Sequence, residues 1–286
     1  MILIADSGST KTDWRLIDEQ KGIHQFNTHG INPYFQSSDE IAEQVLKATL
    51  YPQMHTANRD PNSVTEIFFY GAGCGNDSKK EIVGNALVEK FPNAKVQVET
   101  DMFGAARALC GKEQGMVAIL GTGMNTCVYN GNSIIANTAS LGYVLGDEGS
   151  GAYLGKAFIS AFLNQELPGD LRRRFEERFK LSKEDILDAV YKQPYPNRFL
   201  ASFSKFIYQN LKEQYIIDLV AVCFGEFFDK HVCKFNNHQE MQLSCTGSVA
   251  FYYSNIFRAV AAKKSVAIKA IVESPIAGLT LFHLGE

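Results

Sequence analysis

The stretch "IADSGSTKTDW" occupies residues 4–14 and decides the fold of the chain. An apolar run, Ile2–Asp6, ends in an aspartate, and a second strand-like run covers Thr12–Ile17 after a turn of small residues. Serine, glycine and threonine in this turn leave backbone N–H groups open to a tetrahedral anion. The stretch lacks the GxxxxGK[ST] pattern of a P-loop. It predicts a β-hairpin and leaves two roles open, a phosphate grip or a polar turn shaped by Asp6 and Ser7.

A second stretch, "AILGTGMNTCVYNGNS" at residues 118–133, repeats the order of strand, glycine turn and strand. If the turns around Gly8 and Gly123 face each other across a cleft, each can hold part of a polyphosphate, which favours a nucleotide. A nucleotide triphosphate brings Mg²⁺, which takes oxygen ligands and keeps several waters, and Asp6 at a strand end is placed to hold it. The donors to the phosphates would be backbone amides, the hydroxyls of Ser7, Ser9, Thr10 and Thr122, and the Lys11 ammonium.

Strand-like and helix-like runs alternate in the first third of the chain, and the pattern then restarts, which predicts a duplicated α/β architecture. The expected strands are Ile2–Asp6, Thr12–Ile17, His24–His29, Val64–Tyr70, Lys95–Thr100, Met116–Leu120, Thr126–Tyr129, Ser133–Asn137, Met241–Cys245 and Val266–Val272. The expected helices cover 38–50 with a Ser37–Glu40 capping box, 78–91, Met102–Cys110, most of 152–236, 248–262 and a last helix opened by Pro275.

Composition limits the classes of function. The chain of 286 residues is long enough for two domains, and its formal net charge is −3. The basic run at 172–174 is followed by Glu176 and Glu177, so it predicts a solvated helix face rather than a nucleic-acid site. We expect no membrane partner and a cytoplasmic location, because no leader or spanning segment is recognisable. The six cysteines form no CxxC pair and are expected to be buried free thiols.

Asp101 lies in "VQVETDMFGAARA", residues 96–108, where a strand ends and a helix of small residues begins. Aspartate is a favoured helix N-cap. A carboxylate at the carboxyl end of a strand is also where ligands of α/β folds bind, and phosphoryl transfer to an alcohol needs a general base. The residues alone support the two roles equally.

The stretch "LGYVLGDEGSGAYLG", residues 141–155, combines five glycines with the adjacent acids Asp147 and Glu148. Such a loop can pass close to a ligand, and Asp147 could accept hydrogen bonds from sugar hydroxyls. Both acids could also complement the dipole of the helix that follows Gly149. The two roles are compatible with each other.

Other candidates are weaker. Asn32 precedes a proline and indicates a turn, and Tyr34 is expected in the core. Gly247 and Ser248 join a strand to a helix, where adenine or ribose could approach the backbone. The loop 71–77 is expected to line a cleft without a named role. The histidines lack metal-binding spacing, and the aromatic helices near 199–215 and 224–235 predict core or a subunit interface.

Taken together, these motifs resemble the N-acetylglucosamine kinase branch of the BadF/BadG-type ATPase family, within the actin/hexokinase/Hsp70 ATPase superfamily. The resemblance rests on "DSGSTKTDW", "LGTGMN", "TDMFGAARA", "GDEGSGAYLG", "CTGSVA" and "SPIAGLTLF", in this order along the chain. It implies an α/β, two-domain actin-like ATPase (ribonuclease H-like) fold, with duplicated βββαβα cores and a cleft between them. The implied domains are 1–110 with the C-terminal helix 275–286, and 111–274 with a helical insertion.

The resemblance also implies roles for single residues, and an ATP-dependent kinase that phosphorylates an amino sugar at O6. Asp6 would hold Mg²⁺ through water, and Asp101 would take the proton from the attacking hydroxyl. ATP and its phosphates would contact Ser7, Gly8, Ser9, Thr10, Lys11, Thr122, Gly123, Gly247 and Ser248. The sugar would contact Asn32, Asp101, Met124, Asn125, Gly142 and Asp147.

Three departures from the family pattern concern the sugar side. The family's G-G-W-G-H is Ala139–Tyr143 here, Met124 replaces a common serine, and Tyr34 replaces a common tryptophan. ATP is therefore better supported than N-acetylglucosamine, and glucosamine, N-acetylmannosamine, N-acetylmuramic acid or another small alcohol stay open as acceptors.

Other activities on the same fold were also considered. The GDEGSG loop argues against a type III pantothenate kinase, and the missing cysteine pair argues against a dehydratase activator with an iron–sulfur cluster. A non-catalytic sugar-sensing ATP-binding protein is the alternative outside enzymes. The family suggests a homodimer.

Overall fold

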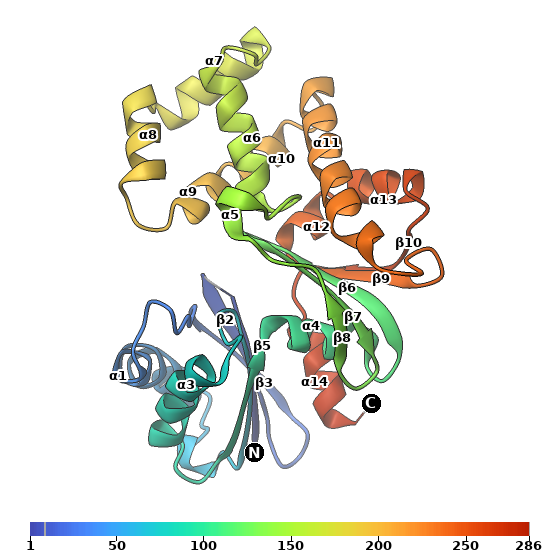
Figure 1. Ribbon diagram of the computed structural model, residues 1–286. Helices are drawn as coiled ribbons and strands as arrows, with labels where there is room; N and C mark the ends of the chain where they lie inside the picture. Colours follow the sequence, from blue (N-terminus) through green and yellow to red (C-terminus); the bar gives the residue numbers. More distant parts are fainter. Residues whose placement is uncertain (9, 286) are drawn as a thin grey trace. The chain divides into compact units, whose positions relative to one another are not determined.

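The computed structural model describes residues 1–8 and 10–285. The described chain divides into two compact units, which are treated separately. Unit 1 comprises Met1–Lys112 and Pro275–Glu286, and unit 2 comprises Glu113–Ser274. Figure 1 labels the elements of both units along the chain. No helix among the described residues is long and apolar enough to cross a membrane.

The described part of unit 1 contains one five-stranded sheet with the order β3-β2-β1-β4-β5. The strands are β1 (Ile2–Ser7), β2 (Lys11–Ile17), β3 (Ile23–His29), β4 (Glu66–Gly71) and β5 (Lys95–Thr100). β1 is antiparallel to β2 and parallel to β4, and β4 is parallel to β5. The register pairs Ser7 with Gly71 and Gly71 with Thr100, so three strands end side by side at one edge of the sheet.

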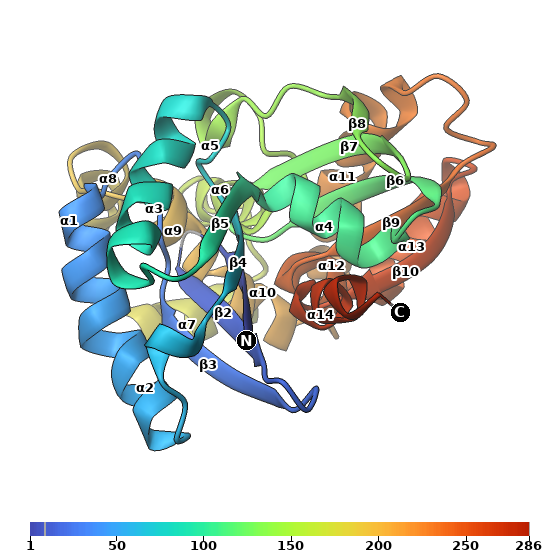
Figure 2. The ribbon, with the colours of Figure 1, turned by 90° about the horizontal axis from the view of Figure 1, so that it is seen from below.

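Helices cover both faces of this sheet (Figure 2). One face packs against α1 (Ser38–Glu40), η1 (Ile41–Leu50), α2 (Tyr51–Thr56) and α3 (Asp77–Lys90), the other against α4 (Asp101–Cys110) and α14 (Ile276–Leu284). Alternation along β1 explains the two layers, because Leu3 and Ala5 join the first core and Ile4 joins the second. A short 3-10 turn, η2 (Pro61–Ser63), precedes β4.

Most of the expected elements of unit 1 are confirmed, including the capping box of Ser37 and Glu40. The expected helix 38–50 continues to Thr56 and has π-type winding in η1. The prediction for Tyr34 was wrong: its ring is 59% exposed, whereas Trp14 is fully buried. A proline-containing turn carries Tyr34, and no apolar periodicity holds the ring in a core.

Unit 2, in its described residues, has a five-stranded sheet of the same connection pattern, with the order β10-β9-β6-β7-β8. The strands are β6 (Gln114–Leu120), β7 (Met124–Asn130), β8 (Ile134–Asn137), β9 (Gln242–Thr246) and β10 (Ala267–Val272). β6 is antiparallel to β7 and parallel to β9, as β1 is to β2 and β4. The duplicated α/β core expected from the sequence is therefore present.

The helices of unit 2 contribute to a core rich in phenylalanine. They are α5 (Gly142–Leu145), α6 (Gly151–Leu163), α7 (Gly169–Phe179), α8 (Lys183–Tyr191), α9 (Pro196–Ser202), α10 (Ser204–Gln209), α11 (Gln214–Lys230), η3 (Val232–Lys234), α12 (Ser248–Tyr252) and α13 (Ser254–Lys263). Phe175 lies at its centre, with ring centroids 5.2 Å from Phe158 and 5.4 Å from Phe206. The aromatic helices contribute to this core, which was one of the two roles predicted for them; the other was a subunit interface.

Two smaller predictions also hold. Arg172 and Arg173 on α7 pair with Glu176 and Glu177 one turn later, which makes a solvated helix face. The cysteines in the described residues are free thiols, and all are buried except the partly exposed Cys233.

Candidate functional site

The hairpin between β1 and β2 presents an open turn at the carboxyl edge of the unit 1 sheet. The Gly8 N–H donates to the Lys11 carbonyl at 3.0 Å and closes the turn. Gly8, Thr10 and Lys11 are exposed, and a side chain built at Gly8 would meet only the Lys11 carbonyl, at 3.8 Å. This turn can therefore accept an anion on its outer side. Ser9, also expected to bind phosphate, lies outside the described residues.

Ser7 differs from its neighbours because its side chain is fully buried. Its hydroxyl oxygen accepts the Ile31 N–H at 3.0 Å and lies 2.8 Å from the Thr12 hydroxyl. These bonds fasten the hairpin to the segment that carries Asn32. The phosphate contact of Ser7 stays a prediction, and in this conformation its hydroxyl is already hydrogen bonded.

Two carboxylates stand opposite each other on the hairpin, since the register pairs Asp6 with Asp13. Like charges in this position repel, and the Lys11 ammonium lies 2.9 Å from the Asp13 carboxylate. The donor chemistry fits Mg²⁺, which proteins bind through one or two carboxylates together with substrate phosphates. Asp6, at the strand end beside the turn, is the residue that would hold the ion. Lys11 has three N–H donors, so it can bond Asp13 and a phosphate together.

Asp101 begins α4 at the same edge of the sheet. Its predicted capping role belongs to its neighbour, because the Thr100 hydroxyl accepts the Phe103 N–H at 3.1 Å. The Asp101 carboxylate instead accepts the Met102 N–H at 2.8 Å. Burial raises the pKa of Asp101 above its ordinary value, and the hydrogen bond from Met102 opposes this in part. A raised pKa makes a carboxylate a better proton acceptor.

Asn32 is held in an Asx turn, where its side-chain carbonyl accepts the Tyr34 N–H at 3.0 Å. The loop after β4 lies against it: Gly73 has φ +83°, and a side chain there would come within 2.7 Å of the Asn32 carbonyl oxygen. Lys79 contributes too, because its ammonium bonds the Pro33 carbonyl at 3.0 Å and lies 4.6 Å from the centre of the Tyr34 ring. Neither Gly73 nor Lys79 was predicted to have a role, and the available signal was a glycine-rich loop at a strand end.

Cys74 in this loop has an inert thiol. Burial, together with the negative charge of Asp101, raises its pKa to about 12, which places Asp101 near the loop. A thiol with so high a pKa stays protonated at neutral pH and is a weak nucleophile.

The second glycine turn, Gly121–Gly123, is bonded to the start of α6. The Gly151 N–H donates to the Gly121 carbonyl at 2.8 Å, and the Ala152 N–H donates to the Thr122 carbonyl at 3.0 Å. Thr122 and Gly123 are partly buried. The N–H groups of Gly151 and Ala152, in the first turn of α6, therefore already have hydrogen-bond partners in the glycine turn.

Asp147 joins the same turn from the GDEGSG loop. It is buried, has φ +58°, and its carboxylate accepts the Met124 N–H. A side chain at Gly123 would lie 3.1 Å from a carboxylate oxygen of Asp147, a tight contact that Asp147 would have to relieve by a small shift. Burial raises the pKa of Asp147, against the lowering effect of the Met124 N–H. Gly123, Met124 and Asp147 are thus brought together.

Two further candidates flank this group. Asn125 is partly buried, and its side-chain carbonyl accepts the Thr126 N–H at 2.9 Å. Gly142 has φ +73°, and its carbonyl accepts the Gly146 N–H at 2.8 Å in the short helix α5. That helix was not expected in the glycine-rich loop.

Glu148 is an anchor inside unit 2. It is 5% exposed and lies 3.0 Å from both the Lys230 ammonium and the His231 ring. Burial tends to raise the pKa of Glu148, but hydrogen bonds from His231 and Lys230 outweigh it and hold the pKa below its ordinary value. His231 was not predicted as a site residue, because it carries no local motif.

Gly247 connects β9 to α12 at the end of the sheet where β6 ends, since β6 and β9 are parallel and in register. It has φ +111°, and a side chain there would lie 2.3 Å from the Leu120 carbonyl oxygen. Packing against β6 thus requires glycine at this position. Ser248, the first residue of α12, is exposed beside it.

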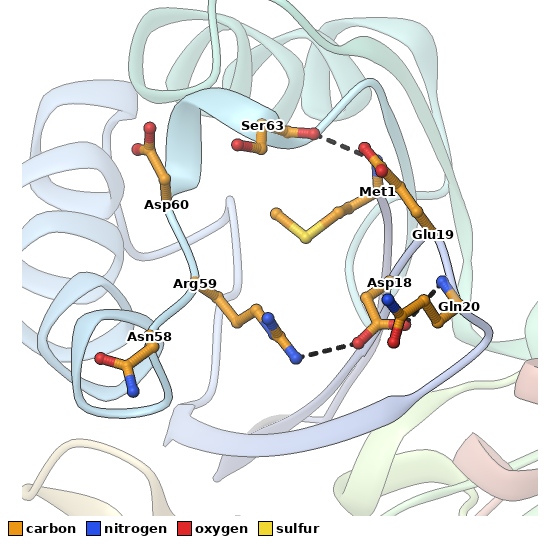
Figure 3. A pocket seen from close by; sticks show the side chains of 8 residues that line it. All are labelled: Met1, Asp18, Glu19, Gln20, Asn58, Arg59, Asp60 and Ser63. Atoms are coloured by element: carbon orange, nitrogen blue, oxygen red, sulfur yellow. Dashed lines mark hydrogen bonds and ion pairs between the residues drawn. The ribbon is translucent and has the colours of Figure 1, made fainter.

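A surface hollow of about 340 Å³ lies elsewhere in unit 1, at the amino end of β1 (Figure 3). Its lining holds one ion pair, in which the Arg59 guanidinium is 2.9 Å from the Asp18 carboxylate, and the Met1 amine donates to the Ser63 carbonyl at 3.0 Å. None of the expected site residues lines it.

Comparison with known proteins assigns the chain to a family. The sequence profile of the BadF/BadG/BcrA/BcrD ATPase family matches residues 5–278. The chain belongs to this family. The match includes every one of the expected site residues named above, from Asp6 to Ser248.

Two relatives in the family and one more distant fold are informative. The chain is 41% identical to a crystal structure from Porphyromonas gingivalis described as a "Putative N-acetylglucosamine Kinase", with a TM-score of 0.94 over 100% of this chain and 99% of that one. It is 24% identical to an N-acetylmuramic acid/N-acetylglucosamine kinase of Clostridium acetobutylicum, over 71% of this chain and 68% of the relative. A ROK family glucokinase from Streptomyces griseus shares the fold, with a TM-score of 0.56 at 14% identity over 98% of this chain and 97% of that one.

Proposed function

We propose that this chain is an ATP-dependent kinase that phosphorylates an amino sugar, with N-acetylglucosamine at O6 as the first candidate. One observation carries the proposal: the parallel strands β1 and β5 bring the open hairpin turn and the Asp101 carboxylate to one edge of the unit 1 sheet. Phosphoryl transfer to a hydroxyl needs a phosphate-binding segment beside a carboxylate that can accept a proton, and burial raises the pKa of Asp101. The family and the kinases named above support the same activity.

The hairpin binds the phosphates of ATP in this proposal. Gly8, Thr10 and Lys11 supply donors from unit 1, and Ser9 belongs to the same expected set. Thr122 and Gly123 supply donors from unit 2, with Gly247 and Ser248 beside the adenosine. Mg²⁺ neutralises charge on the transferred group when it is bound, and Asp6 would hold it.

Asp101 acts as the general base. Its carboxylate takes the proton from the acceptor hydroxyl as that oxygen bonds the γ-phosphorus. The bond between the γ-phosphorus and the β–γ bridging oxygen breaks, and ADP leaves with that oxygen. The Met102 N–H holds one carboxylate oxygen, which orients the group for the acceptor.

Hydrogen bonds to hydroxyls define the acceptor. Asn32 offers its side-chain amide, and Asn125 and Asp147 offer polar groups in unit 2, with Met124 and Gly142 beside them. An amino sugar carries several hydroxyls that these groups can hydrogen bond. A polar site of this kind strongly rejects analogues that lack one of the hydroxyls. N-acetylmuramic acid, glucosamine and N-acetylmannosamine are the competing acceptors. A homodimer and a cytoplasmic location belong to the same proposal.

The dehydratase-activator alternative needs cysteine ligands for an iron–sulfur cluster. Within the described residues the cysteines are free thiols, all buried except the partly exposed Cys233, and no group of three or more His, Cys, Asp or Glu side chains could hold a metal ion.

The test is release of ADP from Mg²⁺-ATP with a panel of amino sugars. We expect N-acetylglucosamine to stimulate ADP release and the product to carry phosphate on O6. A sugar that binds without raising ADP release would indicate a sugar sensor instead. If no sugar in the panel either binds or stimulates release, the amino-sugar proposal is wrong.

A further inference from the structure

A chain of buried hydrogen bonds runs beneath the GDEGSG loop of unit 2. His231, at the end of α11, is 6% exposed and lies between two partners. Its Nε2 is 3.0 Å from a Glu148 carboxylate oxygen, and its Nδ1 is 3.1 Å from the Thr138 hydroxyl. Thr138 in turn bonds the Thr126 hydroxyl on β7. The chain thus links strand β7, helix α11 and the loop.

The direction of these hydrogen bonds follows from the chemistry of Glu148. A carboxylate only accepts hydrogen bonds, so the His231 Nε2–H donates to it. In the neutral ring, Nδ1 then accepts from the Thr138 hydroxyl, which accepts from Thr126. Both ring nitrogens have partners, so the imidazole orientation is fixed. Lys230 bonds the other carboxylate oxygen of Glu148 at 3.0 Å from a more exposed position.

Glu148 occupies the corner of a tight turn. The Ser150 N–H donates to the Asp147 carbonyl at 3.0 Å, which leaves Glu148 and Gly149 as the central residues. Gly149 has φ +76°, as the second central residue of a type II turn requires. The fastening of the Glu148 side chain therefore fixes the backbone directly after Asp147.

Asp147 needs such support. Its φ of +58° is unfavourable for a residue with a side chain and persists only where the surroundings over-determine it. In this backbone conformation of the loop its carboxylate accepts the Met124 N–H. If Glu148 is released, the turn can relax and the carboxylate loses its place beside Gly123.

We propose that His231 is a positioning residue for acceptor binding, which acts through Glu148 to hold Asp147 in place. The inference rests on the proposed kinase function and adds a residue to its machinery. His231 does not touch the acceptor. Its loss raises the KM for the sugar more than the KM for ATP.

A matched pair of substitutions tests this. In His231→Gln the side-chain amide N–H replaces Nε2–H, so the bond to Glu148 is kept and the bond to Thr138 is lost. In His231→Asn the side-chain carbonyl oxygen takes the place of Nδ1 and accepts from the Thr138 hydroxyl, so the bond to Thr138 is kept and the bond to Glu148 is lost. We expect a sugar KM within about threefold of wild type for His231→Gln and raised about tenfold or more for His231→Asn. The KM for ATP should change less than threefold in both.

A second readout needs no substrate. Amide hydrogen exchange at residues 147–150 should be faster in His231→Asn than in His231→Gln, while exchange in β6 and β9 stays the same in both. If wild type responds to no sugar, the kinase proposal fails, and the exchange rates still test the role of His231. Equal exchange and an equal sugar KM in the two variants would overturn the inference.

Two more variants guard against simple misfolding. Lys230→Met removes the outer partner of Glu148 and should leave the sugar KM within about twofold. Thr138→Val keeps the shape and removes the donor to Nδ1, while the bond from His231 to Glu148 stays, so the sugar KM should stay within about threefold of wild type, as in His231→Gln. If Thr138→Val raises the sugar KM as much as His231→Asn does, the effect does not run through Glu148 and the inference is wrong.

Discussion

The Ser7 hydroxyl accepts a hydrogen bond from the Ile31 N–H at 3.0 Å, across 24 residues of sequence. Both residues are fully buried. The bond joins the hairpin turn expected to bind phosphate to the segment expected to bind sugar. It assigns Ser7 a structural contact that exists without any ligand.

Replacing Ser7 with alanine should therefore lower stability. The substitution leaves the buried Ile31 N–H and the Thr12 hydroxyl short of a partner, which costs about 1–3 kcal/mol of unfolding free energy. Urea unfolding followed by far-UV circular dichroism measures it. Thr10→Ala, on the exposed part of the same turn, is the control and should change stability by less than about 0.5 kcal/mol. Equal effects of the two substitutions would contradict the role of Ser7.

Asp101→Asn should abolish most of the activity without unfolding the protein. The side-chain carbonyl of asparagine can still accept the Met102 N–H, while the general base is gone. We expect kcat for sugar phosphorylation to fall about a hundredfold or more. ADP release measures kcat, and equilibrium binding of the sugar confirms that the site survives. Turnover close to wild type would refute the assignment of the base.

The activity of wild type should fall in acid at a higher pH than an ordinary aspartate would allow. The base works only when ionised, and burial raises the pKa of Asp101 above the reference of about 3.9. The descending acid limb of log kcat/KM against pH reports this value for the free enzyme. A profile that stays flat down to about pH 4 would show that no such group is essential.

The same pKa shift has a consequence for stability with a defined sign. A carboxyl whose folded pKa is raised favours folding below its unfolded pKa, and that contribution is lost as the pH rises through the folded value. Asparagine does not ionise, so Asp101→Asn does not lose this contribution as the pH rises. The unfolding free energy of the variant, relative to that of wild type, should therefore increase between about pH 4 and neutral pH. Urea unfolding at several pH values measures the difference, and a difference independent of pH would contradict the burial of the charge.

Gly73→Ala should disturb the sugar side through Asn32. Gly73 has φ +83°, and the new methyl group would come within 2.7 Å of the side-chain carbonyl oxygen of Asn32. We expect a loss of about 1–2 kcal/mol in unfolding free energy and a raised KM for the sugar. Gly75→Ala in the same loop is the matched control, since a side chain there meets nothing within 4 Å. A sugar KM raised equally by both would assign the effect to the loop in general.

Local patterns predicted most of the fold. Strands such as β1 and β5 followed from apolar runs that end at turn residues, and the Ser37–Glu40 capping box marked a helix start. The second glycine turn was found because it repeats the order of the first. These features depend on neighbours within a few residues, so they can be read directly from the sequence.

Long-range contacts were not predictable in the same way. His231 bonds Glu148 across 83 residues, and the side chain of Ser7 turns toward Ile31 and away from the open face of the hairpin. The helix cap at Thr100 was missed because two adjacent residues could both supply it. In each case the partner is chosen by the fold, since a buried polar group takes the partner that packing brings to it.

The N–H groups of Gly151 and Ala152 donate to the carbonyls of Gly121 and Thr122, so backbone hydrogen bonds hold the glycine turn and the start of α6 together. In the proposed kinase, a nucleotide that orders this turn would also order the loop that ends in Ser150, and a sugar that orders the loop would also order the turn. Because such linkage is reciprocal, each ligand would then change the affinity of the other by the same factor. Unit 2 would thus favour the ternary complex over either binary one, and ATP bound without an acceptor would meet a less ordered turn.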